Sequence, residues 1–204
     1  MIILDILIEN TDLIHRIFTD IARVTKYTHV GIAIALIYGV MYLLYVIICK
    51  KLKRERKLGA GHATAVFALL IYLTAVLFIV FMSREPGVNT GVNLHLWSSW
   101  GNTTLRKALF IENIIMFIPM GILLPGAFKI FRNPIACILT CAVLSCFIEN
   151  TQYLFKLGIA EIDDVVTNTL GGAIGWIIWG ILWVIYLIIY KCFKKNNKIN
   201  VTKT

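Results

Sequence analysis

The stretch VGIAIALIYGVMYLLYVIIC, residues 30–49, runs for 20 residues without a charged side chain. A transmembrane α-helix needs about 20 mostly apolar residues to cross a hydrocarbon core about 30 Å thick. A second uncharged run of the same length, ATAVFALLIYLTAVLFIVFM, occupies residues 63–82. The two runs therefore predict two membrane-spanning helices.

Three further spans are predicted downstream. They cover residues 108–128, 134–155 and 165–190. Pro119 and Pro125 interrupt the hydrogen-bond ladder of the first of these three and are expected to kink it. The predicted fold class is therefore an all-α, polytopic integral membrane helical bundle. Its transmembrane domain, residues 29–190, contains five transmembrane helices.

The composition agrees with a membrane protein and excludes several soluble classes. The chain of 204 residues is 59% hydrophobic and 15% charged, with a mean hydropathy of +0.80, whereas soluble domains are about half apolar and a quarter charged. Five spans and short loops leave no room for a separate nucleotide-binding domain. Neither a glycine-rich phosphate loop nor an HExxH zinc signature occurs in the sequence.

The first 28 residues differ from the spans because charged residues are interspersed among apolar ones. Ile3, Leu7, Ile14, Ile17, Ile21 and Val24 recur among Asp5, Glu9, Asp12, Arg16, Asp20 and Arg23. This spacing predicts an amphipathic N-terminal segment, residues 1–28, that lies as a helix on the membrane surface. A cleavable signal peptide is not expected, since the start lacks a cationic segment and a small-residue cleavage site.

Lys and Arg residues predict the orientation of the chain. Most of the 20 basic residues fall in three segments, namely residues 50–57, residues 129–132 and a basic tail at 191–204. Five alternating spans place all three segments on one side, which the positive-inside rule assigns to the cytoplasm. The N-terminus then lies outside, and of the 11 acidic residues only Glu55 lies inside. The net charge of +9 is thus a topology signal, and no nucleic-acid partner is predicted.

Polar side chains are concentrated in FIENTQYLFKLGIAEIDDVVTN, residues 147–168, between two spans. A helix that starts at Pro134 rises about 1.5 Å per residue, so Glu149 is expected about 22 Å from the inner surface, in the outer part of the bilayer. The neighbouring spans bring further amides and carboxylates to the same depth. The predicted ligand-binding residues are Arg84, Asn113, Glu149, Gln152, Asp163, Asp164 and Asn168.

Some of these groups also have a structural interpretation. Asp163 and Asp164 suit the start of a helix, where carboxylates satisfy free N–H groups and meet the positive end of the helix dipole. Asn113 and Asn168 suit hydrogen bonds between helices. Gly171 and Gly175 lie on one face with Asn168, and such glycines let two helices approach closely.

Three blocks of the sequence resemble the VanZ-like family of bacterial membrane proteins. The blocks are ENIIMFIPMGILLPGAF (112–128), FIENTQYL (147–154) and EIDDVVTNTLGGAIG (161–175). The resemblance covers about residues 93–180. It is carried by Asn113, Phe117, Pro119, Gly121, Pro125, Glu149, Gln152, Asp164, Asn168 and Gly171. Structural roles are assigned to Pro119, Gly121, Pro125, Gly171 and Gly175.

The chain departs from the family pattern in two places. Many relatives have an Arg shortly before a Phe-Asp-x-Asp-Asp-like stretch, where this chain has Leu157, Gly158 and Ile159, followed by Ala160 and Glu161. The usual Asn-Leu-x-Pro-Phe of the outer loop appears here as Asn93, Leu94, His95, Leu96 and Trp97. If the Arg binds an anionic ligand in relatives, Lys156 or Arg84 would have to replace it here.

The resemblance implies resistance to glycopeptide antibiotics, in particular teicoplanin and related lipid-tailed molecules, and a location in the bacterial cytoplasmic membrane. The implied partners are membrane lipids and either a lipid-linked cell-wall precursor or the lipoglycopeptide itself. Such molecules meet at the outer leaflet, where the polar residues are expected. The leading hypothesis is a non-catalytic protein whose outward-facing polar pocket binds a lipid headgroup or the drug.

Glu149 supports two alternative hypotheses. A charged side chain within lipid costs about 2 to 3 kcal/mol, so it must pair, stay protonated or line a wet cavity. In an integral-membrane enzyme acting on a lipid-linked envelope substrate, Glu149 would be the candidate acid or base. Asp163 and Asp164 would then be weak candidates for holding a divalent cation; no other cofactor is predicted. A proton or ion pathway through Glu149 is the third hypothesis.

Overall fold

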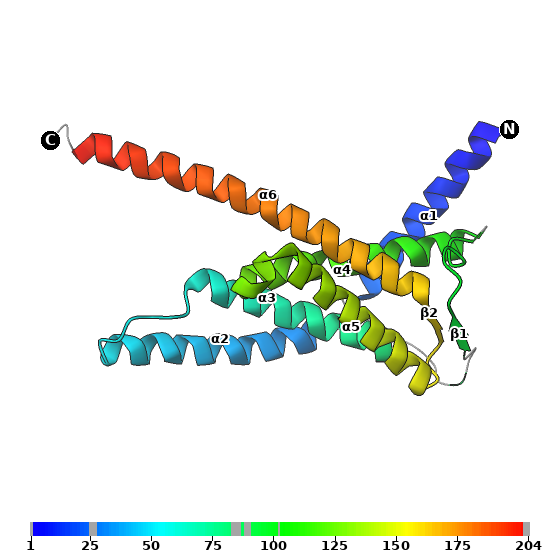
Figure 1. The fold of residues 1–204 in the computed structure, drawn as a ribbon, viewed down its shortest axis with the longest axis horizontal. Coiled ribbons are helices and arrows are strands. Elements are labelled where there is room, and N and C mark those ends of the chain that lie inside the picture. Colours follow the sequence, from blue (N-terminus) through cyan, green and yellow to red (C-terminus); the bar gives the residue numbers. More distant parts are fainter. Residues whose placement is uncertain (1, 25–27, 83–86, 88–90, 102, 202–204) are drawn as a thin grey trace.

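The structure is a computed structural model that describes residues 2–24, 28–82, 87, 91–101 and 103–201 (Figure 1). Its elements are α1 (Ile2–Val24), α2 (Thr28–Lys51), α3 (Ala60–Leu77), η2 (Phe78–Met82), β1 (Gly91–Asn93), α4 (Thr104–Ala127), η3 (Lys129–Arg132), α5 (Pro134–Leu154), β2 (Ile159–Glu161) and α6 (Ile162–Val201). The element η2 is a π-helical turn that continues α3, and η3 is a short 3-10 helix. The predominance of helices confirms the predicted all-α fold class, whereas the two three-residue strands were not predicted.

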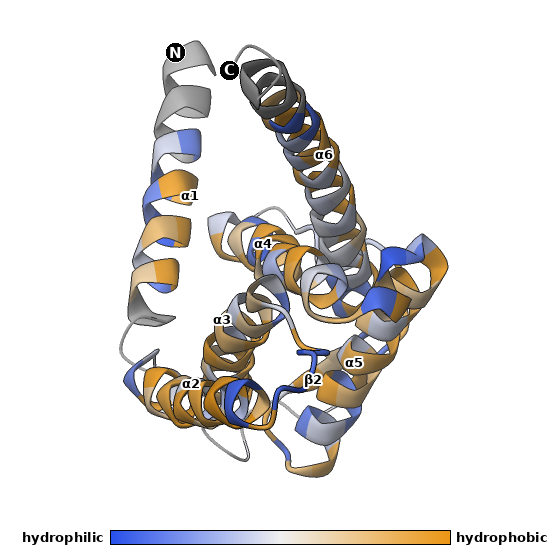
Figure 2. Ribbon diagram, turned by 90° about the vertical axis from the view of Figure 1, so that its left-hand side faces the viewer, coloured by the Kyte–Doolittle hydropathy of each residue, from blue (hydrophilic) through white to orange (hydrophobic). Residues whose placement is uncertain are grey.

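Five of the described helices are long and apolar enough to cross a membrane. They are Thr28–Lys51, Ala60–Phe81, Thr104–Ala127, Pro134–Leu154 and Ile162–Lys194. Figure 2 colours α2 and α3 as hydrophobic along most of their length. Large apolar side chains such as Ile37 on α2, Ile135 on α5 and Ile181 on α6 are exposed, and a lipid environment would cover them. Each predicted span falls on one of these five helices.

Helix α4 lies at the centre of the bundle, packed against α6, α3 and α5. Its side chains Phe117 and Met120 are buried in one hydrophobic core with Cys137 and Cys141 of α5 and Leu69 of α3. The two cysteines therefore serve as small apolar packing residues. This core fixes the positions of α5 and α6, which carry most of the buried polar groups described below.

Glycines allow α4 and α6 to approach each other backbone to backbone. A Cβ atom at Gly171 would collide with the carbonyl oxygen of Ile114, and one at Gly175 would collide with that of Ile118. On the other helix, a Cβ atom at Gly121 would collide with the carbonyl oxygen of Gly172. Small residues at such a crossing permit the close van der Waals packing that holds helices together in lipid.

Helix α4 continues through both of its prolines, Pro119 and Pro125. Pro119 has no N–H group, so the carbonyl oxygen of Ile115 loses its usual helical donor. The Tyr72 hydroxyl of α3 donates a hydrogen bond of 2.7 Å to the neighbouring carbonyl oxygen, that of Met116. This bond attaches α3 to α4 beside the carbonyl group that the proline leaves without its helical donor.

Helix α6 is the longest element, with 40 residues. At about 1.5 Å per residue it is about 60 Å long, roughly twice the thickness of a hydrocarbon core. An aromatic stripe on α6 is formed by Trp176, Trp179, Trp183, Tyr186 and Tyr190. It contacts η3, because the Arg132 guanidinium carbon lies 4.7 Å from the ring centre of Trp183. The Trp176 indole N–H also donates to the carbonyl oxygen of Phe131 at 3.2 Å. The stripe therefore attaches the middle of α6 to the bundle.

Helix α1 projects from one end of the bundle, at an angle to the other helices, and contacts α4 (Figure 1). Ile14, Phe18 and Ile21 are exposed and lie on one face of it. Arg16 and Asp20 form an ion pair of 3.8 Å on the opposite face. A helix with one apolar face and one charged face suits a position in the membrane interface, parallel to the plane of the membrane.

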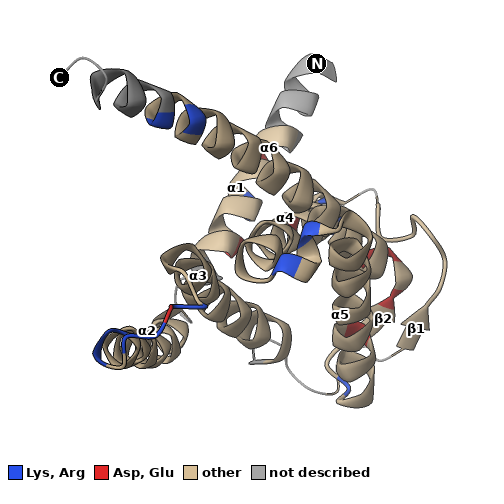
Figure 3. Cartoon of the chain, turned by 60° about the vertical axis from the view of Figure 1, so that its left-hand side comes forward, with Lys and Arg blue, Asp and Glu red and all other residues tan. Residues whose placement is uncertain are grey.

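Charged residues are unevenly distributed along the bundle (Figure 3). Lys and Arg gather in the loop after α2 and in the C-terminal part of α6, whereas Asp and Glu gather around β2 and the adjoining ends of α5 and α6. The bundle thus has one basic end and one acidic end. Among the residues that the structure describes, the polar side chains predicted to bind a ligand lie toward the acidic end.

Candidate functional site

A cluster of buried polar side chains occupies the junction of α5, β2 and α6. We call it the polar cluster, and it consists of Ser145, Glu149, Gln152, Asp163, Thr167 and Asn168. The first three belong to α5 and the last three to α6. The loop that follows β1 lies against the same junction, so the cluster is closed by backbone as well as by helices.

Helix α5 contributes its three polar residues on a single face, because positions 145, 149 and 152 are spaced by four and three residues. The Ser145 hydroxyl accepts a hydrogen bond of 2.8 Å from the Asn168 side-chain amide of α6. The Glu149 Oε2 atom accepts one of 3.1 Å from the backbone N–H of Glu161 in β2. The Gln152 side-chain amide donates one of 3.3 Å to the carbonyl oxygen of Val80 in η2. One helix face thereby connects three other elements.

The Val80 contact has a clear physical basis. The last carbonyl groups of a helix lack an intrahelical donor, and Val80 lies near the end of the π-helical turn that terminates α3. Gln152 donates to this carbonyl group from a side chain that is only 1% exposed. π-Helical turns occur often at functional sites, and here the turn borders the polar cluster.

Asp163, at the start of α6, holds the loop that follows β1. Its Oδ1 atom accepts a hydrogen bond of 2.6 Å from the backbone N–H of Trp97, and its Oδ2 atom accepts one of 2.7 Å from that of Ser99. Glu161 Oε2 adds a third bond, of 2.6 Å, from the Ser99 hydroxyl. Hydrogen bonds to ionised acceptors are shorter and stronger than those between neutral groups. Two carboxylates thus fix this loop.

The two short strands bring the loop to the start of α6. Strands β1 and β2 pair in parallel, with Val92 opposite Ala160 and Asn93 opposite Glu161. The Asn93 side-chain amide donates to the Ser98 hydroxyl at 2.8 Å. Trp97 adopts a φ of 65°, a left-handed conformation that is uncommon for a bulky residue. The two hydrogen bonds around Asp163 hold the backbone in that conformation.

Two buried acceptor atoms of the polar cluster have no hydrogen-bond partner among the described residues. They are the Oε1 atom of Gln152 and the Oδ1 atom of Asn168. Both side chains are 1% exposed. A buried polar atom without a partner costs about 1 to 3 kcal/mol, so a ligand that supplied donors at these positions would recover that cost.

The structure brings together four of the predicted site residues, Glu149, Gln152, Asp163 and Asn168, and it places two others nearby. Asn113 is half-buried on α4, one residue before the Ile114 carbonyl that faces α6. Asp164 is half-buried, and its backbone carbonyl lies 3.4 Å from the Ser145 hydroxyl that donates to it. Arg84 lies outside the described residues. Lys156, considered as a replacement for the family Arg, is exposed.

Asp163 and Asp164, the predicted metal candidates, lie at the start of α6. Among the described residues, no three His, Cys, Asp or Glu side chains form a group that could hold a metal ion. Asp163 uses both carboxylate oxygens on backbone N–H groups. A divalent cation at that carboxylate would have to bind oxygens that already accept these two bonds.

Sequence reasoning missed several members of the site. Ser145 and Thr167 are buried in the polar cluster, and the spacing of Ser145 from Glu149 and Gln152 was the signal that could have identified it. Glu161 was noted only as a departure from the family pattern. The backbone N–H groups of the loop gave no sequence signal at all, because any residue type carries one.

The fold and the polar cluster define a multi-pass helical membrane protein with buried polar groups at one end. The chain matches the VanZ/LLP1 family over residues 66–186 and belongs to that family. Protein VanZ of Enterococcus faecium is 35% identical to it over 114 residues, which cover 52% of this chain and 68% of the relative. No solved structure matches the chain. The match confirms the family resemblance predicted from the three sequence blocks.

Proposed function

We propose that this protein contributes to resistance to teicoplanin or related lipoglycopeptides, and that its polar cluster binds a lipid headgroup or the drug. Family membership and the relationship to Protein VanZ support the first part of this proposal. The observation that carries the second part is the pair of buried acceptors without partners, Gln152 Oε1 and Asn168 Oδ1.

The chemistry of the cluster favours a ligand that donates hydrogen bonds. Its unpartnered atoms are both amide carbonyl oxygens, and the neighbouring Glu149 adds a carboxylate. A glycopeptide carries many N–H and O–H groups, and many lipid headgroups carry hydroxyl or ammonium groups. An ammonium group would also be attracted by the carboxylate, since charge-assisted bonds are about twice as strong as neutral ones.

The proposed location is the bacterial cytoplasmic membrane, with the basic end of the bundle in the cytoplasm. The positive-inside rule supports this orientation, and it would place the polar cluster toward the outer leaflet. Leu94, Leu96 and Trp97 of the adjoining loop are exposed. Apolar and aromatic side chains of this kind suit the headgroup region of a bilayer, where a lipid-tailed drug is found.

A direct binding experiment tests the ligand part of the proposal. Full-length protein in lipid nanodiscs is titrated with teicoplanin, and with vancomycin for comparison. Gln152→Leu and Asn168→Ala are each expected to weaken teicoplanin binding by about two- to tenfold. This change in affinity corresponds to the free energy of one hydrogen bond. Asn150→Ala is the matched control, because Asn150 lies on the same helix and is exposed. Equal affinity for all four proteins would contradict a drug site in the polar cluster.

The same preparations distinguish the drug from a headgroup. If teicoplanin does not bind but headgroup-bearing lipids co-purify with wild type and are lost in both variants, the cluster is a lipid site. If neither teicoplanin nor any lipid depends on Gln152 or Asn168, the proposed ligand site is wrong. Circular dichroism of each variant confirms that helix content has been retained.

A further inference from the structure

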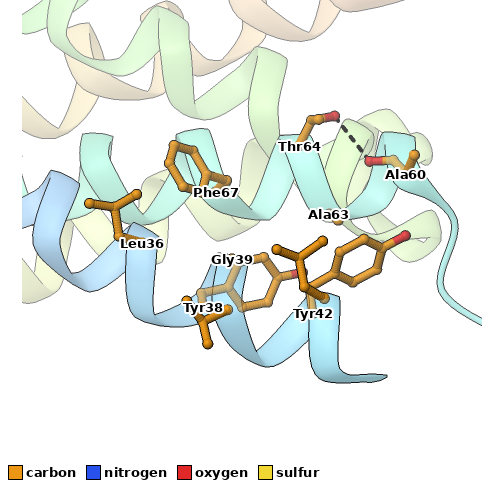
Figure 4. Close-up of a pocket in the computed structure, with 10 residues that line it drawn as sticks. Leu36, Tyr38, Gly39, Tyr42, Ala60, Ala63, Thr64 and Phe67 are labelled. Atoms are coloured by element: carbon orange, nitrogen blue, oxygen red, sulfur yellow. Dashed lines mark hydrogen bonds between the residues drawn. The ribbon is translucent and has the colours of Figure 1, made fainter. Parts of the chain in front are cut away.

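An open groove lies between α2 and α3, at the basic end of the bundle. It measures about 350 Å³ and is lined by residues that include Leu36, Gly39, Ala63 and Phe67 (Figure 4). The Thr64 hydroxyl in its wall donates within α3, to the carbonyl oxygens of Ala60 and Gly61. The groove therefore presents an apolar surface, and it lies at the opposite end of α3 from the polar cluster.

The basic loop, residues 50–58, lies over one end of this groove. The Tyr45 hydroxyl of α2 accepts hydrogen bonds from the backbone N–H groups of Lys57 at 2.9 Å and Leu58 at 3.4 Å. The Tyr42 hydroxyl donates to the carbonyl oxygen of Leu58 at 3.4 Å, and the Tyr42 side chain also lines the groove. Tyrosines beside the groove thus determine where the loop lies.

The cations of the basic loop are available to a ligand. Lys51, Lys53, Arg54, Arg56 and Lys57 are all exposed. None of them forms an ion pair within the part of the chain that the structure describes. Their positive charge is concentrated within a few residues of the groove entrance, and a phosphate group is the anion that such a set of Lys and Arg side chains would attract.

Tyr38 contributes an apolar ring to the groove. Its side chain lines the groove one helical turn from Tyr42, farther from the basic loop. The Tyr38 hydroxyl oxygen is buried and has no hydrogen-bond partner among the described residues. A ligand in the groove would therefore contact the ring of Tyr38 and not this buried oxygen.

We propose that the groove between α2 and α3 binds one acyl chain of an anionic phospholipid whose phosphate contacts the basic loop. The apolar wall and the exposed cations at its end follow the order of acyl chain and phosphate in such a lipid. This site is separate from the polar cluster and does not depend on the function proposed for it. In the orientation proposed above it would take a lipid from the cytoplasmic leaflet.

Native mass spectrometry of the detergent-purified full chain tests this site with two lipids that differ in headgroup charge. Dioleoyl phosphatidylglycerol and dioleoyl phosphatidylcholine are added in parallel, and the fraction of protein that retains each lipid is measured. Wild type is expected to retain phosphatidylglycerol in preference to phosphatidylcholine. Removal of two loop charges, in Arg54→Gln/Lys57→Gln, should lower that retention on the order of tenfold.

Matched controls separate this site from general lipid attraction. Lys191→Gln/Lys194→Gln removes two exposed charges from α6 and should leave retention unchanged. Gly39→Leu fills the groove and should abolish the preference for phosphatidylglycerol. Gly39→Ala should fold normally, since its Cβ atom would lie 3.8 Å from the Phe67 ring, an ordinary contact. Gly180→Leu, on an open stretch of α6, is the control for a surface leucine.

Several results would overturn the proposal. Equal retention of the two lipids by wild type would show that the charges of the basic loop do not select an anionic lipid. Equal losses from the loop pair and the α6 pair would show unspecific attraction. Retention by Gly39→Leu at the wild-type level would show that the acyl chain lies elsewhere. A dimeric mass that Gly39→Leu converts to a monomer would assign the groove to a second copy of the chain.

Discussion

The carboxylate of Asp163 accepts a hydrogen bond of 2.6 Å from the backbone N–H of Trp97, a residue 66 positions away in the chain. Its other oxygen accepts from Ser99. Asp163 is buried while the Trp97 side chain is exposed, so a buried anion supports an exposed aromatic loop. The acidic end of the bundle therefore has a defined shape in which the loop and the start of α6 are held as one unit.

Asp163→Asn is expected to loosen this loop. The amide of Asn offers one acceptor oxygen in place of two, so either Trp97 or Ser99 loses its partner. The loss of one bond to a charged acceptor should lower the free energy of unfolding by about 1.5 to 3 kcal/mol. Hydrogen exchange at residues 97–99 measures the effect. The control is Asp164→Asn, and equal protection of the loop in wild type and Asp163→Asn would show that the carboxylate does not hold it.

Alanine at Gly171 or Gly175 is expected to separate α4 from α6. Each new Cβ atom would collide with a carbonyl oxygen of α4, and such overpacking typically costs about 1 to 3 kcal/mol. Unfolding in a denaturing detergent gives the change in free energy. Gly180→Ala is the control because nothing lies within 4 Å of its Cβ position; it should gain up to about 1 kcal/mol of helix propensity. The close packing would be disproved if all three variants behaved alike.

The hydrogen bond between Asn168 and Ser145, 2.8 Å long, should give a measurable interaction energy between the two side chains. A double-mutant cycle with Asn168→Ala and Ser145→Ala is expected to give an interaction energy of about 0.6 kcal/mol, and at most about 1.7 kcal/mol. Unfolding free energies of the four proteins supply the cycle. Strict additivity of the two single changes would mean that this bond adds no stability.

Much of the fold could be predicted from the sequence because a membrane span is recognisable from its length and its lack of charged residues. The uncharged runs at 30–49 and 63–82 fall on α2 and α3, and the prolines of α4 did not prevent the prediction of a helix there. The strands β1 and β2 could not be predicted, since three residues carry too little pattern. Their pairing depends on segments that lie far apart in the sequence.

The site was predictable only in part. Glu149 and Gln152 were found because a polar residue within an apolar helix is costly and therefore conspicuous. Their partners are the backbone N–H of Glu161 and the carbonyl of Val80, which no side-chain pattern reveals. Asp163 was assigned to the start of a helix, which is where it lies, but its bonds to the loop required tertiary structure.

Labelling with a membrane-impermeant thiol reagent tests the proposed orientation. His95→Cys and Arg56→Cys are introduced separately into a chain whose exposed Cys146 and Cys192 have been replaced by Ser. Intact cells should label the Cys at position 95, while the Cys at position 56 should react only after lysis. These positions lie on the exposed loop after β1 and on the basic loop. The reverse pattern would place the polar cluster on the cytoplasmic side.

The most direct test of the central claim is growth inhibition by teicoplanin of a susceptible strain that expresses this protein. Wild type, Glu149→Gln and Asn168→Ala are compared with Asn150→Ala at matched membrane levels, and vancomycin is assayed in parallel. Wild type and Asn150→Ala are expected to protect against teicoplanin, and the two cluster variants are expected to lose protection. Full protection by the cluster variants, or none by wild type, would contradict this claim.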